Sequence, residues 1–286
     1  MRPVIGLAAA AMAFAAPAMA QQGAQDAQYR VASPDGRNVV TVGTHDGVLW
    51  YAVDHNGHHV IQPSRLGFAF RGGDTLQKSV RITGTARDSA DVTWTQPWGE
   101  VARVRDHHRE LRVRVAEEKA PGRRFAVVFR VFDDGVGFRY EVSDSASFRA
   151  FEMDDELTEF ALADNARAWW ISAKCCDPDR QERLYTSGPV SRVDTVQTPL
   201  TLQMTDGTQV VIHEADLEDY AGMYLARTDN RTLRSTLAKW ADGVAVRGTA
   251  PFVTPWRTIS CPWCMLPWSV RSPTYPVFTA RTPTRW

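Results

Sequence analysis

The chain has 286 residues, with 33 Lys and Arg against 33 Asp and Glu, so its formal net charge is zero. This balance argues against the basic surface that binding to nucleic acid or to an anionic membrane requires. After residue 20 the sequence has no uninterrupted apolar stretch of about 20 residues, the length that a membrane-spanning helix needs. The segment 29–259 is long enough for one large all-β domain.

The first 20 residues have the pattern of a secretory signal peptide. Arg2 precedes an Ala-rich apolar run from Val4 to Ala16, and Pro17-Ala18-Met19-Ala20 follows. These small residues are typical of a cleavage site after Ala20. We expect an exported mature chain, located in a bacterial-type periplasm.

Short apolar-alternating runs separated by turn residues occupy the chain from residue 29 to 259. The clearest are 39–42, 48–53, 80–82, 92–94, 110–115, 125–131, 138–142, 201–204 and 209–213. Such runs predict strands, and because helical patterns do not alternate with them, they predict packed antiparallel sheets. Only short pieces, such as Met153 to Phe160 or Asp216 to Tyr220, are candidates for helices.

Two neighbouring runs predict different degrees of burial. Glu110 to Val115 alternates charged with apolar residues, so one of its faces should be exposed. Phe125 to Val131 is almost entirely apolar and should be buried on both faces. Asp133 and Asp134 precede Gly135, where Asp favours a tight turn. We therefore interpret these two carboxylates as turn residues and not as a catalytic pair.

The composition changes abruptly after Ile259. From Ser260 to Trp286 the sequence contains no Asp, Glu, Lys or Gly, and prolines interrupt it at Pro262, Pro267, Pro273, Pro276 and Pro283. Proline breaks helices and is excluded from the middle of sheets. We expect residues 260–286 to be an unstructured tail, and interpret it as the product of a frameshift or truncation near residue 260.

The four cysteines do not form a convincing functional motif. Cys175 and Cys176 are adjacent, and Cys261 and Cys264 form a single Cys-x-x-Cys pair in the tail. A structural zinc site needs four ligands, and a redox pair should open a helix, which the nearby Pro262 disfavours. We interpret the cysteines as incidental.

Acidic and histidine residues supply few candidates for chemistry. Glu214 lies between an apolar strand and an acidic segment, where it is either a calcium ligand or part of a solvated turn. The acidic run from Glu152 to Glu156 is expected on a solvated face or loop. The adjacent pairs His58-His59 and His107-His108 cannot chelate one ion, because neighbouring residues of a strand point to opposite faces. We assign no catalytic residue.

Tryptophans are candidates either for sugar stacking or for packing. Trp94, Trp98, Trp169 and Trp170 have aromatic faces that suit hexoses. Packing is the more common use of such large side chains, and we favour it for Trp98, Trp169 and Trp170. Phe252 and Trp256 are expected to pack against a further domain and to be exposed where that domain is absent. The substrate-binding residues are left unassigned.

Several strings in a fixed order resemble one known family. They are Ser33-Pro34-Asp35-Gly36, Ile61-Gln62-Pro63-Ser64-Arg65-Leu66-Gly67, Trp98-Gly99-Glu100, the run 129–140, Thr158-Glu159-Phe160, Trp169-Trp170, Thr198-Pro199-Leu200-Thr201, Ile212-His213-Glu214-Ala215 and Thr254-Pro255-Trp256-Arg257-Thr258-Ile259. From about Ser33 to Ile259, the chain resembles the N-terminal domain of glycoside hydrolase family 97, which includes α-glucosidases and α-galactosidases.

The resemblance implies a fold for this chain and a role for each domain of the family's enzymes. It implies a galactose-mutarotase-like β-super-sandwich, followed in the family by a catalytic (β/α)8 barrel that carries the catalytic carboxylates and most calcium ligands. The N-terminal domain supplies one calcium-binding glutamate from a His-Glu-Ala string. The matching residue in this sequence is Glu214.

The expected function follows from this resemblance. The chain should be the N-terminal domain of an exported hydrolase of α-glucosides or α-galactosides, contributing one wall of an α-linked oligosaccharide pocket and the ligand Glu214. Because the barrel is missing, we expect the chain alone to be inactive and to bind calcium weakly or not at all. A free-standing carbohydrate-binding β-sandwich module is the alternative, and a mutarotase-like epimerase using His213 is a third hypothesis.

Overall fold

A computed structural model describes residues 27–260, apart from 96, 98–101, 144–147, 149 and 174–182. The expected signal peptide with Ala20, nearly all of the expected tail, the four cysteines and Trp98 lie outside the described residues. Ser260, the first residue of that tail, is described and ends a strand. Within the described part, no helix has the length and apolar character needed to cross a membrane.

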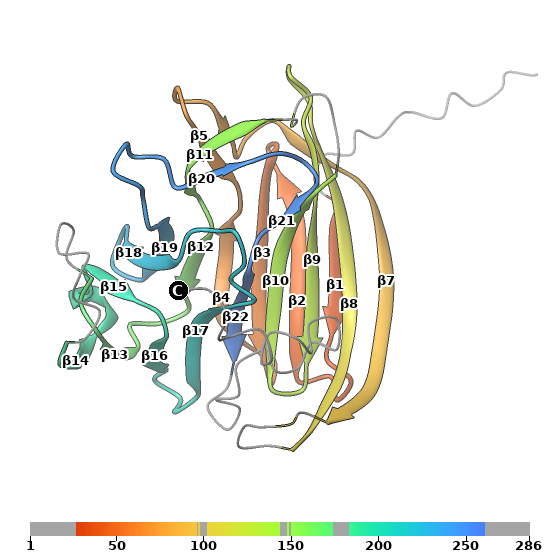
Figure 1. The fold of residues 1–286 in the computed structure, drawn as a ribbon. Coiled ribbons are helices and arrows are strands. Elements are labelled where there is room, and N and C mark those ends of the chain that lie inside the picture. Colours follow the sequence, from red (N-terminus) through yellow and green to blue (C-terminus); the bar gives the residue numbers. More distant parts are fainter. Residues whose placement is uncertain are drawn as a thin grey trace, which may run out of the picture.

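The described chain forms three antiparallel sheets (Figure 1). The eight-stranded sheet has the order β1 (Gln28–Ala32), β2 (Asn38–His45), β3 (Val48–His55), β4 (His58–Arg65), β12 (Glu159–Leu162), β19 (Thr232–Leu237), β18 (Met223–Arg227) and β15 (Thr195–Gln197). The four-stranded sheet has the order β20 (Val246–Gly248), β11 (Phe151–Glu156), β5 (Phe68–Phe70) and β6 (Thr75–Leu76).

The ten-stranded sheet is the largest. Its order is β14 (Thr186–Pro189), β13 (Arg167–Trp170), β16 (Leu200–Gln203), β17 (Gln209–Ala215), β22 (Trp256–Ser260), β10 (Gly135–Val142), β9 (Arg124–Phe132), β8 (Arg103–Glu117) and β7 (Val80–Thr95), with β21 (Phe252–Val253) pairing with β10. A short 3-10 helix, η2 (Val190–Arg192), follows β14. The last described strand, β22, therefore lies in the middle of this sheet, between β17 and β10.

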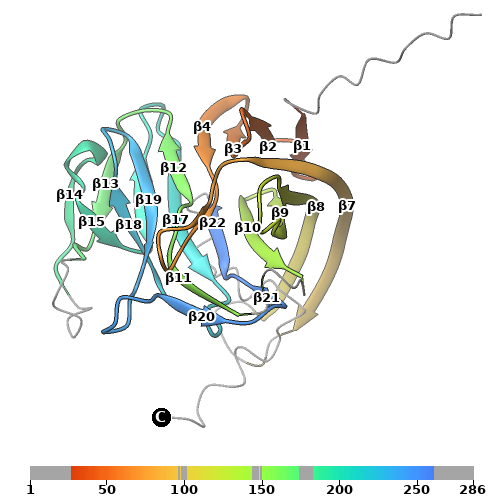
Figure 2. The same ribbon diagram turned by 90° about the horizontal axis from the view of Figure 1, so that it is seen from above.

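The two large sheets face each other across an apolar core. Figure 2 shows β1–β4 on one side of this core and β8–β10 on the other. Tyr51 of β3 reaches across, with its ring centre 4.8 Å from that of Phe138 on β10 and 6.2 Å from that of Phe129 on β9. All three side chains are completely buried. The predicted all-β sandwich of antiparallel sheets is thus confirmed.

The burial pattern follows the sequence in the central strands. In β9 nearly every residue is buried on both faces, as its continuous apolar run predicts. In β8, Leu111, Val113 and Val115 point into the core, while Arg114 is exposed on the other face. The turn at Asp133 and Asp134 joins β9 to β10, as predicted.

The two helical predictions are wrong. Residues 153–160 form the end of β11 and the start of β12, where pairing with β5 and β19 overrides the local pattern. Residues 216–220 are irregular, and Asp216 and Asp219 have φ angles of 61° and 47°. Such left-handed backbone is incompatible with an α-helix.

The β3–β4 hairpin shows how local sequence sets a turn. Asn56 and Gly57 have φ angles of 51° and 80°, as a two-residue turn between twisted strands requires. Both ring nitrogens of the preceding His55 form hydrogen bonds. Nδ1 lies 2.6 Å from Asn38 Oδ1, and Nε2 lies 2.9 Å from Asn56 Nδ2. A neutral ring that donates from Nδ1 and accepts at Nε2 satisfies both contacts.

This environment makes His55 a source of pH-dependent stability. Burial lowers the pKa of His55, and the nearby Arg37 lowers it further, although Asp35 and Asp206 oppose the shift. The unfolded chain therefore binds more protons than the folded chain just below the ordinary histidine pKa of about 6.5. Stability should fall as pH decreases from about 7 through this window and level off below the folded-state pKa.

We predict that His55→Gln removes this part of the pH dependence. Urea unfolding of wild type and variant at several pH values between 5 and 8 measures the effect. As a control, Val60→Ala creates a cavity near His55 and should cost about 1–3 kcal/mol at every pH, with the wild-type pH dependence retained. Equal pH dependence in wild type and His55→Gln would contradict the prediction.

Candidate functional site

Glu214 is positioned by the pairing of two central strands of the ten-stranded sheet. It lies directly opposite Arg257, in the register that also pairs Ile212 with Ile259. Because residues 210 and 212 face the core and alternate positions share a face, Glu214 points to the inner side of the sheet. Arg257 Nη1 donates a 2.8 Å hydrogen bond to Glu214 Oε2.

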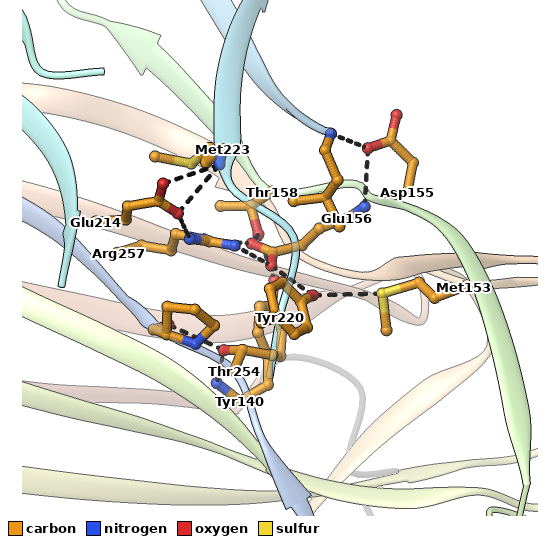
Figure 3. Close-up of polar contacts among 12 residues, drawn as sticks. Tyr140, Met153, Asp155, Glu156, Thr158, Glu214, Tyr220, Met223, Thr254 and Arg257 are labelled. Atoms are coloured by element: carbon orange, nitrogen blue, oxygen red, sulfur yellow. Dashed lines mark hydrogen bonds and ion pairs between the residues drawn. The ribbon is translucent and has the colours of Figure 1, made fainter. Parts of the chain in front are cut away.

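Arg257 is completely buried and also binds a second carboxylate. Its Nε donates to Glu156 Oε1 at 3.0 Å, and its Nη2 donates to Glu156 Oε2 at 2.7 Å, a bidentate pair. Glu156 ends β11 and is itself fully buried. Figure 3 shows the guanidinium between the two carboxylates. The expectation that the run from Glu152 to Glu156 is solvated is wrong for Glu156, because Arg257 provides a buried counter-charge.

Hydroxyl groups complete the surroundings of Glu156. Thr158 Oγ1 donates to its Oε1 at 2.7 Å, and the Tyr220 hydroxyl donates to its Oε2 at 3.0 Å. The Tyr140 hydroxyl lies 2.7 Å from Thr158 Oγ1 and extends the network (Figure 3). Burial raises the pKa values of Tyr140 and Tyr220, and the charge of Glu156 adds to the effect. Both phenols are therefore neutral donors at physiological pH.

The two glutamates keep Arg257 in its charged form. Burial by itself would lower the pKa of Arg257, but the charge of Glu156 and its hydrogen bonds, with a smaller effect of Glu214, raise the pKa above its ordinary value. The guanidinium is therefore permanently charged. Burying an ion without hydrogen-bonded partners strongly destabilises the folded state. The two glutamates provide these partners and allow an arginine at this buried position.

Glu214 differs from Glu156 in having access to the outside. Its side chain is 10% exposed, whereas that of Glu156 is fully buried. Besides Arg257, the backbone N–H of Met223 donates to this carboxylate, with the nitrogen 2.9 Å from Oε1 and 3.1 Å from Oε2. A carboxylate offers about four acceptor sites, so Glu214 keeps free lone pairs. It can present oxygen to a ligand that arrives from outside.

The donor set fits calcium in part. Calcium prefers six to eight oxygen ligands, and Glu214 supplies a fixed, partly exposed carboxylate. Across the described ranges, however, no group of three or more His, Cys, Asp or Glu side chains is arranged to hold a metal ion. The described residues therefore provide one ligand and not a complete coordination shell.

The residues beside Glu214 face elsewhere. His213 pairs with Thr258 on the outer side of the sheet, its Nδ1 is buried without a partner in the described chain, and burial lowers its pKa. Asp216 Oδ2 lies 4.0 Å from Arg139 Nη1, also on the outer side, and burial raises its pKa. Neither side chain joins Glu214 and Arg257 on the inner face.

Trp256, on the outer face of the ten-stranded sheet, is covered by other residues of the chain. Trp256 lies between two guanidinium groups, 4.8 Å from that of Arg130 and 4.6 Å from that of Arg139, and packs with Val128, Phe132 and Ala215. It is only 5% exposed. The expectation that Trp256 is exposed without a further domain is therefore wrong, because cation–π contacts with the two arginines cover the ring. Phe252 is half-buried against Phe151, 4.5 Å between ring centres.

Of the tryptophans predicted to pack, Trp169 and Trp170 are described, and both contact other parts of the chain. Trp170 is buried, and Arg167 lies over the half-buried ring of Trp169 at 5.2 Å. Trp240, which the sequence analysis did not single out, is 69% exposed. It lines a groove of about 850 Å³ together with Tyr220, Lys239 and Arg247.

The remaining histidine candidates stay apart. His58 and His59 are both exposed at the start of β4. His107 Nδ1 lies 3.8 Å from Asp133 Oδ2, while His108 is buried against Asp106 on the opposite face of β8. His107 and His108 thus lie on opposite faces of β8, as the alternation of a strand predicts.

Sequence reasoning missed Arg257 and Glu156 as parts of the site. The available signal was an arginine inside the otherwise uncharged strand 256–260. A charged residue at a buried position requires a partner of opposite charge. The partner is 101 residues away in sequence and could not be identified from local patterns.

Comparisons with known proteins agree on one family. The family model described as Glycosyl-hydrolase 97 N-terminal matches residues 31–261. A retaining α-galactosidase of Bacteroides thetaiotaomicron is 26% identical over 223 residues, which are 73% of this chain and 32% of the relative.

Solved structures give the same result. A glycoside hydrolase family 97 enzyme from Pseudoalteromonas sp. strain K8, solved in complex with acarbose, is 38% identical, with a TM-score of 0.78 over 82% of this chain and 35% of that chain. A variant of that enzyme was solved in complex with panose. A β-arabinopyranosidase, 24% identical with a TM-score of 0.75 over 86% of this chain and 43% of that chain, shares the fold. The chain spans about a third of the length of its curated relatives.

The buried pair predicts a strongly non-additive stability effect. Arg257→Met leaves Glu156 as an uncompensated buried charge and should cost about 3–5 kcal/mol in unfolding free energy. The double variant Arg257→Met with Glu156→Leu removes both charges and should recover most of that loss, because buried pairs are often replaceable by apolar residues. Chemical denaturation measures each value.

An exposed pair provides the control. Arg105 and Asp91 form a bidentate surface pair with both side chains more than half exposed. Arg105→Met should leave the free energy of unfolding almost unchanged, because water and salt screen an exposed ion pair. A double variant at Arg257 and Glu156 that is less stable than Arg257→Met would show that the pair itself stabilises the fold, contrary to this account.

Proposed function

Since the chain belongs to glycoside hydrolase family 97 and contains its N-terminal domain, we propose that it supports a hydrolase acting on α-glucosides or α-galactosides. In this proposal the domain contributes one wall of the carbohydrate pocket and presents Glu214 as one ligand of a calcium ion. The catalytic groups belong to the part of the relatives that this chain does not match. The chain alone is proposed to be inactive and to bind calcium weakly.

The position of Glu214 is the observation that carries this proposal. Its carboxylate is anchored by Arg257 and by the Met223 N–H, yet keeps free lone pairs and 10% exposure. An anchored, partly exposed carboxylate can complete a metal site whose other ligands come from elsewhere. When bound, calcium would supply Lewis-acid and electrostatic stabilisation of a reacting sugar oxygen.

The relatives support the class of substrate. The Bacteroides relative is named a retaining α-galactosidase, and the Pseudoalteromonas enzyme was solved with acarbose and with panose. We therefore propose an α-linked oligosaccharide as the substrate of the complete enzyme. Export to a periplasm, with cleavage after Ala20, is part of the same proposal and rests on the sequence pattern of residues 1–20.

A domain exchange tests the proposed function. Residues 27–260 would replace the corresponding N-terminal domain of the Pseudoalteromonas enzyme, and hydrolysis of p-nitrophenyl α-glucoside and α-galactoside would be measured with and without a calcium chelator. We expect chelator-sensitive activity in the chimera and at least a ~100-fold loss in its Glu214→Gln variant. Calcium-dependent hydrolysis by the unfused chain would contradict the proposal.

The exposed Trp240 favours a second candidate, a carbohydrate-binding module. An aromatic face beside Lys239 and Arg247 combines an apolar platform with hydrogen-bond donors, which is the chemistry that a hexose needs. This candidate predicts saturable binding of panose by the chain alone in calorimetry.

The same candidate predicts which substitution matters. Trp240→Ala should weaken panose binding at least ~10-fold, because loss of a stacking aromatic costs about 1–3 kcal/mol. Trp170→Phe, at a buried position, is the control and should leave binding unchanged. If calorimetry shows no saturable binding of panose by the wild-type chain, the carbohydrate-binding module is excluded and the hydrolase domain remains.

A further inference from the structure

Glu156 and Glu214 share one guanidinium unequally. Glu156 accepts two hydrogen bonds from Arg257 and one each from Thr158 and Tyr220. Glu214 accepts one from Arg257 and a shared one from the Met223 N–H. Glu156 is thus saturated and enclosed, whereas Glu214 is neither.

The charges of the cluster do not cancel. Arg257 carries one positive charge, and the two carboxylates carry two negative charges, while the neighbouring Tyr140, Thr158 and Tyr220 are neutral. The bidentate geometry matches Arg257 to Glu156, so that this pair is neutral as a unit. The remaining negative charge therefore resides on Glu214, which is the carboxylate with access to the outside.

We propose that Glu156 sets the cation affinity of Glu214 without touching the cation. Glu156 balances the positive charge of Arg257. The guanidinium can therefore hold Glu214 in place through a hydrogen bond while Glu214 keeps its net negative charge. Without Glu156, the positive charge of Arg257 would be balanced by Glu214 and would repel an incoming cation at close range. This positioning role rests on the proposed role of Glu214 as a cation ligand.

The geometry explains why such an arrangement needs two glutamates. A single carboxylate opposite a buried arginine would be a closed ion pair, with its charge already neutralised. Glu156 accepts hydrogen bonds from Arg257 Nε and Nη2 at 3.0 and 2.7 Å. Glu214 accepts one hydrogen bond from Arg257 Nη1 at 2.8 Å and stays anchored. Arg257 thus serves as an anchor for Glu214, and Glu156 serves as the counter-ion of that anchor.

Terbium luminescence provides the test on the full chain. Tb³⁺ is a hard cation that occupies oxygen sites of the calcium type, and it emits when a nearby aromatic ring is excited. Tyr220 is such a ring, because its centre lies 5.6 Å from the Arg257 guanidinium carbon. Titration of the chain with Tb³⁺ gives an apparent Kd for each variant, and circular dichroism checks that each variant is folded.

The first comparison removes the buried negative charge. Glu156→Gln should weaken Tb³⁺ binding at least ~10-fold, since one unit charge a few ångströms away exceeds 1.4 kcal/mol at an effective dielectric near 20. Glu152→Gln is the matched control, because Glu152 is on the same strand but pairs with Arg247 at the surface. Equal affinities of the two variants would overturn the proposal.

The second comparison restores the charge balance. Glu156→Gln combined with Arg257→Gln removes both charges of the neutral pair. Because the Met223 N–H still holds Glu214, Tb³⁺ affinity should return to within ~3-fold of wild type. This double variant removes the buried Arg257–Glu156 pair as a whole, and therefore tests the proposal even if Glu156→Gln does not fold. A double variant that binds at least ~10-fold more weakly than wild type would show that charge balance is not the determinant.

Glu214→Gln separates this proposal from the proposed function. It should abolish the saturable Tb³⁺ emission of the wild-type chain. If it does not, Glu214 is not the cation ligand, and both the proposed function of Glu214 and the role of Glu156 are overturned. If Glu214→Gln abolishes the emission but Glu156→Gln behaves like Glu152→Gln, only the role of Glu156 is overturned.

Discussion

A fully buried arginine in the central strand of the largest sheet is the constraint on which the rest of the site depends. Arg257 cannot be accommodated among the apolar side chains of β17 and β22 unless carboxylates reach it. The chain meets this requirement with Glu156 on one side and Glu214 on the other (Figure 3). The buried guanidinium of Arg257 needs carboxylates in place of water, and this need determines the position of Glu214.

The same interaction joins the three sheets. Arg257 belongs to the ten-stranded sheet, Glu156 ends a strand of the four-stranded sheet, and Glu214 accepts from Met223 at the start of β18 in the eight-stranded sheet. Apolar packing is non-directional, whereas these hydrogen bonds have fixed distances and angles. The cluster thus fixes the relative placement of three sheets that the apolar core would hold together less specifically.

The sequence predicts the architecture better than it predicts the site. Alternation and continuous apolar runs identify β8 and β9 with their correct burial, because these signals are local. The end of β11 is missed, since an acidic run carries no local sign of burial and Arg257 lies 101 residues further along the chain. Glu214 is identified through the family resemblance, whereas from its neighbours alone it is indistinguishable from a solvated acidic turn.

The location of β22 also determines when the domain can form during synthesis. This strand is the last one described, yet it pairs with β17 on one edge and β10 on the other. Until the ribosome has released it, the ten-stranded sheet is divided into two halves with open edges, and Glu156 and Glu214 have no cation between them. Native folding therefore cannot be completed progressively from the N-terminus, and the nascent chain must be kept from pairing these open edges with other strands until residue 260 is free.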